Sequence, residues 1–226
     1  MNLGVLFSGG KDSTFALHLA AQKEEIACLI TVVSKNEESY MFHTPNIDVT
    51  ALQAEALDLP LISKATEGKR EEELKDLKEA IAQAIKDFRI EGVVSGAIES
   101  VYQSERIQRL CNQLDVWCFN PLWKRNQKEH LGDIVAKGFR VIISGIFAYP
   151  LDRTWLGREI DKDVIERLVR LEKEFGLSPS GEGGEIETTV LDAPMFKEKI
   201  EIMASEVDAK GNSGVFRIKK ARLVPK

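Results

Sequence analysis

A short glycine-rich segment near the start of this 226-residue chain has the residue types that bind phosphate groups. It lies between an apolar run and a run with helical spacing, and it consists of Ser8, Gly9, Gly10, Lys11, Asp12 and Ser13. Two adjacent glycines let the backbone turn sharply and approach a ligand closely. The free amides and dipole of a helix N-terminus add partial positive charge, and Lys11 adds a full one. The segment predicts a polyphosphate or pyrophosphate site.

Two better-known phosphate-binding patterns do not fit this segment. The Walker pattern requires glycine, four residues, and then Gly-Lys-Ser/Thr. Gly4 and Gly9 have the right separation, but Gly10 stands at the lysine position. In the other register, Val5 replaces the first glycine and Asp12 replaces the serine or threonine. The dinucleotide pattern GxGxxG fails as well, because the two glycines of the loop are adjacent.

Alternating strand and helix patterns in the first half of the chain would position this loop. Apolar, β-branched runs predict strands, and apolar residues three or four apart predict amphipathic helices. We expect strands at 3–7, 26–33, 59–63 and 93–96, and helices at 12–21, 46–57 with an Asn46 cap, 71–88 and 100–114. Repeated β-α units predict a parallel sheet with helices on both faces, joined by right-handed crossovers.

Beyond residue 120 the pattern changes and predicts a second unit. Residues 126–136 and 163–175 have helical spacing, and 140–147 and 188–191 read as strands. Residues 199–207 and 215–224 flank a hairpin turn, and the locally basic segment 216–222 is expected either as a lysine-protected edge strand or as a contact surface. The expected class is α/β: a doubly wound, mostly parallel sheet in residues 1–120 and a smaller C-terminal α+β domain in residues 121–226.

Composition excludes several classes of protein. Hydrophobic residues make up 43% and charged residues 30%, which predicts a large core and excludes a disordered chain. No apolar run approaches the roughly 18 residues of a membrane span, and the N-terminus has no signal-peptide pattern, so we expect a cytoplasmic protein. The net charge of -5 disfavours a dedicated nucleic-acid binder. Three cysteines without CxxC spacing, and no HExxH, argue against a disulfide framework and a protein-built metal site.

Four further segments extend the comparison beyond the phosphate loop. They are residues 40–44 (YMFHT), 95–106 (SGAIESVYQSER), 121–123 (PLW) and 181–196 (GEGGEIETTVLDAPMF). Together with SGGKDS, which resembles the PP-loop of N-type ATP pyrophosphatases, they resemble the diphthine–ammonia ligases of the adenine nucleotide alpha-hydrolase-like superfamily. The resemblance covers nearly the whole chain in the same order, and the length is similar to that of the compact archaeal members.

The resemblance implies a reaction and its reactants. Such enzymes split ATP between its α and β phosphates, adenylate a carboxylate and release pyrophosphate. The implied acceptor is diphthine, a modified histidine with a trimethylammonium group and a free carboxylate, on translation elongation factor two. Ammonium would supply the nitrogen, because no glutaminase module is visible, and Mg²⁺ would accompany the ATP. Lys11 and Asp12 are the expected catalytic residues.

The nucleotide is expected to contact the loop and two strand ends. The expected residues are Ser8, Gly9, Gly10, Lys11, Asp12, Ser13, Ser34 and Gly96. Gly96 should end a parallel strand, where open α/β sheets bind ligands. A simple strand stop is the alternative for Gly96, as ordinary strand termination is for Ser34.

The acceptor is expected at the acidic glycine loop and its surroundings. The expected residues are Tyr40, His43, Glu99, Gln103, Arg106, Glu182, Gly183, Gly184, Glu185, Glu187 and Thr188. Carboxylates attract a trimethylammonium cation, and Tyr40, Trp123 or Trp155 would supply an aromatic face unless they belong to the core. Arg106 either holds an anion or forms a surface ion pair, and His43 is either a base or a loop hydrogen-bonder. His18 and His130 are expected to be structural or exposed.

Two rival functions remain open at this point. One is another PP-loop ligase, acting on tRNA or on a small molecule. The other is an adenine-nucleotide sensor without chemistry. An assay for AMP formation separates the sensor from the enzymes, and a substrate screen with tRNA separates the ligases.

Overall fold

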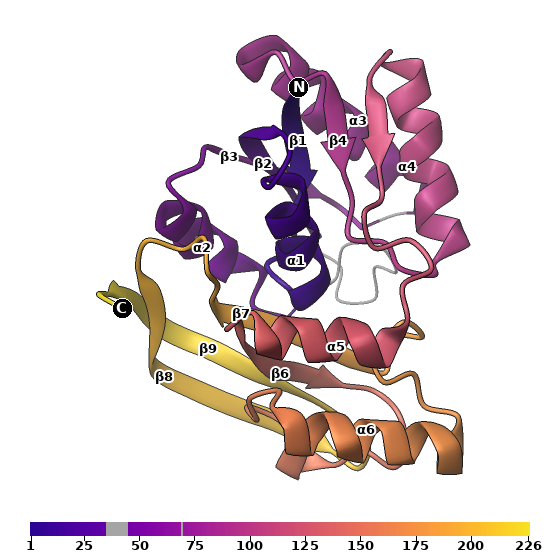
Figure 1. Ribbon diagram of the computed structural model, residues 1–226, viewed down its shortest axis with the longest axis vertical. Coiled ribbons are helices and arrows are strands. Elements are labelled where there is room, and N and C mark those ends of the chain that lie inside the picture. Colours follow the sequence, from indigo (N-terminus) through magenta and orange to yellow (C-terminus); the bar gives the residue numbers. More distant parts are fainter. Residues whose placement is uncertain (35–44, 69) are drawn as a thin grey trace.

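A five-stranded parallel sheet forms from the first half of the chain (Figure 1). The computed structural model describes residues 1–34, 45–68 and 70–226. The strands are β1 (Asn2–Leu6), β2 (Glu25–Ser34), β3 (Leu61–Thr66), β4 (Gly92–Val94) and β5 (Trp117–Phe119). Their order is β3-β2-β1-β4-β5, and every neighbouring pair is parallel. Strands β2 and β3 therefore follow on one side of β1, and β4 and β5 lie on its other side. The strand order reverses between β1 and β4, and open α/β sheets bind ligands in the crevice at such a point.

Helices cover both faces of this sheet. The α1 (Lys11–Ala20) and α2 (Thr50–Leu57) helices pack on one face, and α3 (Arg70–Phe88) and α4 (Val101–Gln113) pack on the other. The alternation of strand side chains explains this, because Leu29 of β2 points to the first face while Ile30 and Val32 point to the second. A short 3-10 helix, η1 (Ile47–Val49), leads into α2.

A four-stranded antiparallel sheet forms from the second half, in the lower part of Figure 1. Its strands are β6 (Arg140–Ile146), β7 (Ile186–Asp192), β8 (Lys199–Lys210) and β9 (Ser213–Val224), in the order β7-β6-β9-β8. The α5 (Gln127–Ala136) and α6 (Lys162–Phe175) helices contact each other beside it, and η2 (Arg153–Trp155) follows β6. The expected α/β class with a smaller antiparallel C-terminal part is confirmed.

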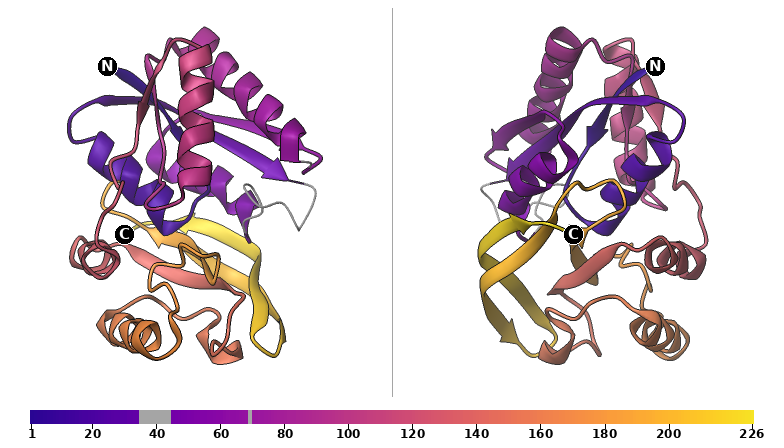
Figure 2. Two further views of the ribbon diagram at one scale, coloured as in Figure 1. Left: turned by 90° about the vertical axis from the view of Figure 1, so that its right-hand side faces the viewer. Right: turned by 60° about the vertical axis from the view of Figure 1, so that its left-hand side comes forward.

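The two sheets lie next to each other (Figure 2), and one hydrophobic core joins them. It includes Phe15 of α1, Leu131 of α5 and Val190 of β7, all fully buried. The backbone amide of Val190 donates to the carbonyl of Gly9 at 3.0 Å, so β7 reaches the loop after β1 directly. The phosphate loop predicted from the sequence thus lies between the two halves of the molecule.

Several elements differ from the sequence-based expectation. The three-residue strand β5 was not predicted, because Trp117 is 67% exposed and the run is too short to show a pattern. The hairpin strands β8 and β9 are longer than expected, and the turn between them is only two residues. β9 lies inside the sheet and β8 is at its edge, although the pairing described between β6 and β9 involves only Gly214 and Val215 of β9.

The expectation that Asn46 caps a helix is wrong. Its side chain makes no capping hydrogen bond. Instead its amide nitrogen donates to Thr189 Oγ1 at 3.2 Å and to the Phe216 carbonyl at 2.9 Å, and its oxygen accepts from the Ile218 amide at 2.7 Å. Asn46 therefore covers the part of β9 that β6 leaves unpaired. Among the described residues, no helix is long and apolar enough to cross a membrane.

Candidate active site

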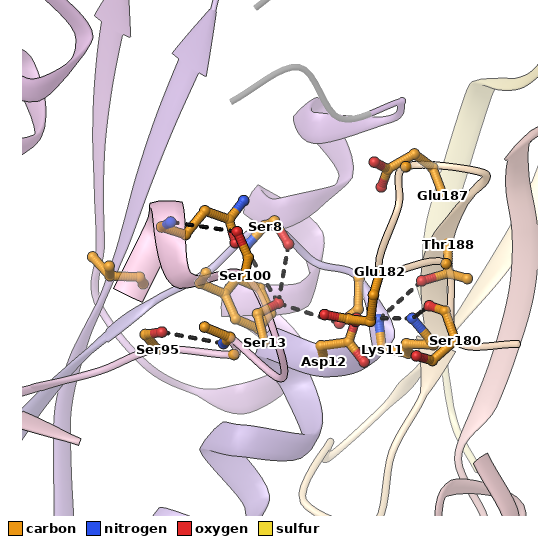
Figure 3. A pocket seen from close by; sticks show the side chains of 18 of the residues that line it. Ser8, Lys11, Asp12, Ser13, Ser95, Ser100, Ser180, Glu182, Glu187 and Thr188 are labelled. Carbon is orange, nitrogen blue, oxygen red and sulfur yellow. Dashed lines mark hydrogen bonds and ion pairs between the residues drawn. The ribbon is translucent and has the colours of Figure 1, made fainter. Parts of the chain in front are cut away.

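A cavity of about 280 Å³ opens where the strand order reverses. Its walls come from the segments after β1 and β4 and from the loop before β7 (Figure 3). Ser8, Ser13, Ser95 and Ser100 lie on one side, Ser180, Glu182, Glu187 and Thr188 lie across from them, and Lys11 and Asp12 lie between. The predicted site residues in its lining are Ser8, Gly10, Lys11, Asp12, Ser13, Gly96, Gln103, Glu182, Gly183, Gly184, Glu187 and Thr188.

Free backbone amides are concentrated in the loop at this cavity. The amides of Gly10, Asp12 and Ser13 have no acceptor among the described residues. The Lys11 amide differs, because it donates to Thr188 Oγ1 at 3.1 Å. Gly9, with φ +74°, makes the turn that an L side chain would strain. Unpaired amides at a helix N-terminus are strong anion donors, so the loop can hold phosphate oxygens.

Lys11, Asp12 and His130 form a connected group below the loop. Lys11 Nζ donates to Asp12 Oδ2 at 2.8 Å and to the Ser180 carbonyl at 2.5 Å. His130 Nε2 lies 2.7 Å from Asp12 Oδ1. Burial alone would lower the pKa of Lys11, but the carboxylates of Asp12, Glu182 and Glu187 together raise that pKa. Burial would raise the pKa of Asp12, but Lys11 and His130 together lower it. Both Lys11 and Asp12 are therefore ionised at neutral pH.

Two glutamates on the opposite wall have pKa values well above the ordinary value of a glutamate. Burial, and then the Asp12 charge, raise the pKa of Glu182 to about 7. Burial raises the pKa of Glu187 to about 7 as well, with Lys11 opposing this and Asp12 and Glu182 adding to it. Three carboxylates thus share one cavity with a single lysine among the lining residues. A bound cation would relieve their repulsion and favour their charged forms.

Replacing Glu187 with glutamine is expected to stabilise the ligand-free protein at pH 8 and to change little at pH 5. The glutamate pKa rises from an ordinary 4.5 to about 7 on folding. The folded state therefore binds more protons between these values, and stability falls as the pH rises through that window. Glutamine does not titrate and avoids the loss, roughly 1–3 kcal/mol.

Melting temperatures of both proteins at the two pH values measure this effect. Glu201→Gln on β8 serves as the control, because Glu201 is exposed and its ion-pair partner is Arg222 at the surface. A Glu187→Gln melting temperature equal to that of the unmodified protein at pH 8 would show that burial does not raise the Glu187 pKa.

The remaining predicted residues lie at or beyond the margin of the cavity. Glu185 stabilises its own loop, because its carboxylate accepts hydrogen bonds from the Ser178 amide at 3.1 Å and the Gly183 amide at 2.9 Å. Glu99 and Glu185 line a shallower adjoining hollow, and the Glu99 amide donates to Glu182 Oε2 at 3.3 Å.

Other predicted residues are absent from the cavity lining or lie outside the described residues. Arg106 donates to the Tyr102 carbonyl at 3.2 Å and stacks over that ring. Ser34, the last residue of β2, pairs with Thr66 and is absent from the cavity lining. Tyr40 and His43 lie outside the described residues.

The expected aromatic face is not supplied by Trp123 or Trp155. Trp155 is 4% exposed within the shared core, and Arg167 stacks on it. Trp123 is 38% exposed and does not line the cavity. The apolar part of the lining instead includes Leu6, Phe7, Ile30, Val32, Leu77 and Ile107. Such a wall suits a flat purine better than a cation.

Sequence reasoning missed several residues that build the site. His130 carried no signal, because nothing in its helix shows that it faces Asp12. Gln53 was visible as a polar residue on the apolar face of its helix, four residues after Val49. Its Nε2 donates to the Gly9 carbonyl at 2.9 Å and to the Val190 carbonyl at 2.7 Å, which ties the loop to β7.

A glutamine on α5 holds the acidic loop in place. Gln127 Oε1 accepts from the amide of Ser180 at 3.1 Å and from the hydroxyls of Ser178 and Ser180 at 2.8 and 2.9 Å. The carbonyl of Ser180 in turn receives Lys11. The loop before β7 is therefore fixed to both α5 and the phosphate loop.

Comparisons with known proteins agree over both halves of the chain. The Diphthamide synthase N-terminal domain matches residues 1–117, and the Diphthamide synthase C-terminal domain matches residues 126–224. A diphthine–ammonia ligase from Mus musculus is 34% identical over 228 residues, covering 91% of this chain and 84% of that protein. One from Homo sapiens is 32% identical, covering 92% and 85%. One from Schizosaccharomyces pombe is 35% identical, covering 89% of this chain but only 36% of that longer protein. The chain therefore belongs to the diphthamide synthase family of ligases.

Proposed function

We propose that this protein catalyses the ATP-dependent amidation of diphthine on translation elongation factor two. The main support for this proposal is that two different surfaces face each other across one cavity. Free amides at the start of α1 suit a polyphosphate, and partly neutralised carboxylates of the loop before β7 suit a cation. Diphthine carries such a cation next to the carboxylate that must be activated. A cytoplasmic location would follow from that acceptor.

The nucleotide would lie along the loop after β1. The amides of Gly10, Asp12 and Ser13 and the hydroxyl of Ser8 would hold the β and γ phosphates. Gly96 would border the nucleoside, with the apolar wall of the cavity against the base. In this proposal residues 1–120 bind ATP, and residues 121–226 supply most of the acceptor site. Catalysis would come from holding the two reactants in the right orientation and from charged groups and dipoles that already point at the transition state.

Magnesium fits the donor chemistry of the cavity. Asp12 offers a carboxylate there, and carboxylate and phosphate oxygens are the ligands that Mg²⁺ prefers. No group of three or more His, Cys, Asp or Glu side chains within the described residues is arranged to hold a metal ion. Phosphate oxygens would therefore complete the coordination. When bound, the ion would offset the negative charge of the phosphates.

The acceptor would enter from the loop before β7. Glu182 and Glu187 would attract the trimethylammonium group, which leaves the diphthine carboxylate free to face the α-phosphate. A carboxylate oxygen attacks the α-phosphorus, the bond to the β-phosphate oxygen breaks, and pyrophosphate leaves with both electrons. Ammonia then attacks the acyl carbon, the bond to the AMP oxygen breaks, and the nitrogen loses one proton as the amide forms. Lys11 would stabilise the charge that develops on the leaving phosphates.

Product analysis tests this proposal. Protein incubated with ATP, Mg²⁺, ammonium and diphthine-bearing factor is expected to yield AMP, pyrophosphate and amidated factor. ADP as the product, or AMP formation that requires tRNA in place of the factor, would overturn it. Glu182→Gln and Glu187→Gln are each expected to raise the KM for the factor about tenfold and to leave ATP binding unchanged, because each removes a charge from the cation site. Glu201→Gln is the matched control.

A further inference from the structure

We infer that His130 is a positioning residue for the phosphate-loop carboxylate Asp12. The inference rests on the proposed function and adds a residue to its site. His130 comes from α5 in the second half of the chain and is 0% exposed. Its Nε2 lies 2.7 Å from Asp12 Oδ1, across a separation of 118 residues. It does not line the cavity, so it would act through Asp12 and not on a ligand.

The ion pair between Lys11 and Asp12 determines which ring nitrogen carries the proton. Lys11 Nζ donates to Asp12 Oδ2 at 2.8 Å, and a carboxylate paired with a lysine accepts hydrogen bonds only. The 2.7 Å contact is therefore an Nε2–H that donates to Oδ1. The two oxygens of Asp12 are held from opposite sides, Oδ2 by its own loop and Oδ1 by α5. This double attachment fixes the plane of a carboxylate whose side chain is 27% exposed and lines the cavity.

The other ring nitrogen indicates that the histidine contributes this hydrogen bond and not packing alone. His130 Nδ1 is buried without a hydrogen-bond partner among the described residues. Its ring meets Phe15 edge-on, with centroids 5.2 Å apart. A leucine, as at the next position, Leu131, would pack there without an unsatisfied nitrogen, which destabilises a fold. The contact with Asp12 is the interaction in the described structure that only a polar side chain can supply.

Two substitutions separate positioning from packing. His130→Leu keeps the apolar contact with Phe15 and removes the donor. It is expected to lower kcat for AMP formation about ten- to hundredfold, with the KM for ATP changed less than about threefold. His130→Gln places an amide N–H where Nε2 lies and is expected to recover kcat to within about threefold of the unmodified protein.

The matched control is His18→Gln, and melting temperatures of all variants accompany the kinetics. His18 contacts the same Phe15 ring and also Phe139, but makes no contact with Asp12, so its replacement is expected to leave kcat unchanged. Equal kcat values for His130→Leu and the unmodified protein would overturn the inference. So would a His130→Gln variant as slow as His130→Leu.

A second measurement does not depend on activity. NMR of ligand-free protein labelled at its histidine ring nitrogens is expected to show a proton on Nε2 of His130, and a changed Nε2 signal in Asp12→Asn. A bare Nε2 would overturn the inference. If the unmodified protein forms ADP and not AMP, the proposed function fails, while the NMR result still reports on the His130–Asp12 contact.

Discussion

Asparagine at position 12 is expected to reduce AMP formation by about 10²–10³-fold, the largest effect of any single substitution at the site. The Asp12 carboxylate receives Lys11 on one oxygen and His130 on the other. An asparagine can still accept from His130, but its NH₂ group then faces the Lys11 ammonium, and two donors repel. Lys11 is 3% exposed and would lose its counter-charge. The phosphate loop would lose both its fixed geometry and a carboxylate that can hold Mg²⁺.

Turnover and nucleotide binding are measured together for this variant, below its melting temperature. The control is Glu201→Gln, because Glu201 is an exposed carboxylate paired with Arg222 on the β8–β9 hairpin. Its turnover and ATP affinity should match those of the unmodified protein. We expect Asp12→Asn to bind ATP more weakly and to form AMP more slowly still. An Asp12→Asn variant with normal kcat and normal ATP affinity would remove Asp12, and with it His130, from the catalytic site.

The parallel half of the fold and the place of the candidate cavity could be predicted from the sequence because both depend on local patterns. A glycine loop after one strand and Ser95-Gly96 after another are recognisable without tertiary information. The reversal of strand order between β1 and β4 then brings the two strand ends together at one cavity. The acidic loop was recognisable because its glycines and carboxylates stand directly before a clear strand.

The contacts across the two halves could not be predicted in this way. Helical spacing shows that His130 lies near Leu131 and Ile134 on a buried face, but not that this face meets α1. Asn46 is of a residue type that often caps helices, yet its side-chain amide donates hydrogen bonds to β7 and β9 instead. Glu185 looked like a ligand group from its motif, whereas the amides of its own loop occupy its carboxylate. Each outcome depends on partners far away in the sequence.

Alanine at position 96 is expected to lower AMP formation about hundredfold, although it adds only one methyl group. A Cβ on Gly96 would lie 2.8 Å from the Ser13 amide nitrogen and 2.9 Å from the Asp12 carbonyl carbon. These are backbone atoms at the start of α1, so the loop itself must shift, and displacements of about 1 Å cost roughly this much in rate. Overpacking should also lower the free energy of unfolding by about 1–3 kcal/mol.

The matched control for Gly96→Ala is Gly132→Ala, which places the same methyl group where it meets nothing. Apart from its chain neighbours and the backbone of α5 itself, no heavy atom of the described residues lies within 4 Å of a Cβ at Gly132, which is inside α5. That variant should gain about 0.5–1 kcal/mol of stability, because alanine favours the helix, and should keep full activity. Denaturant unfolding and AMP formation are measured for both. Full activity in Gly96→Ala would show that the approach of Gly96 to α1 is not what positions the phosphate loop, and that the cavity tolerates a displaced helix start.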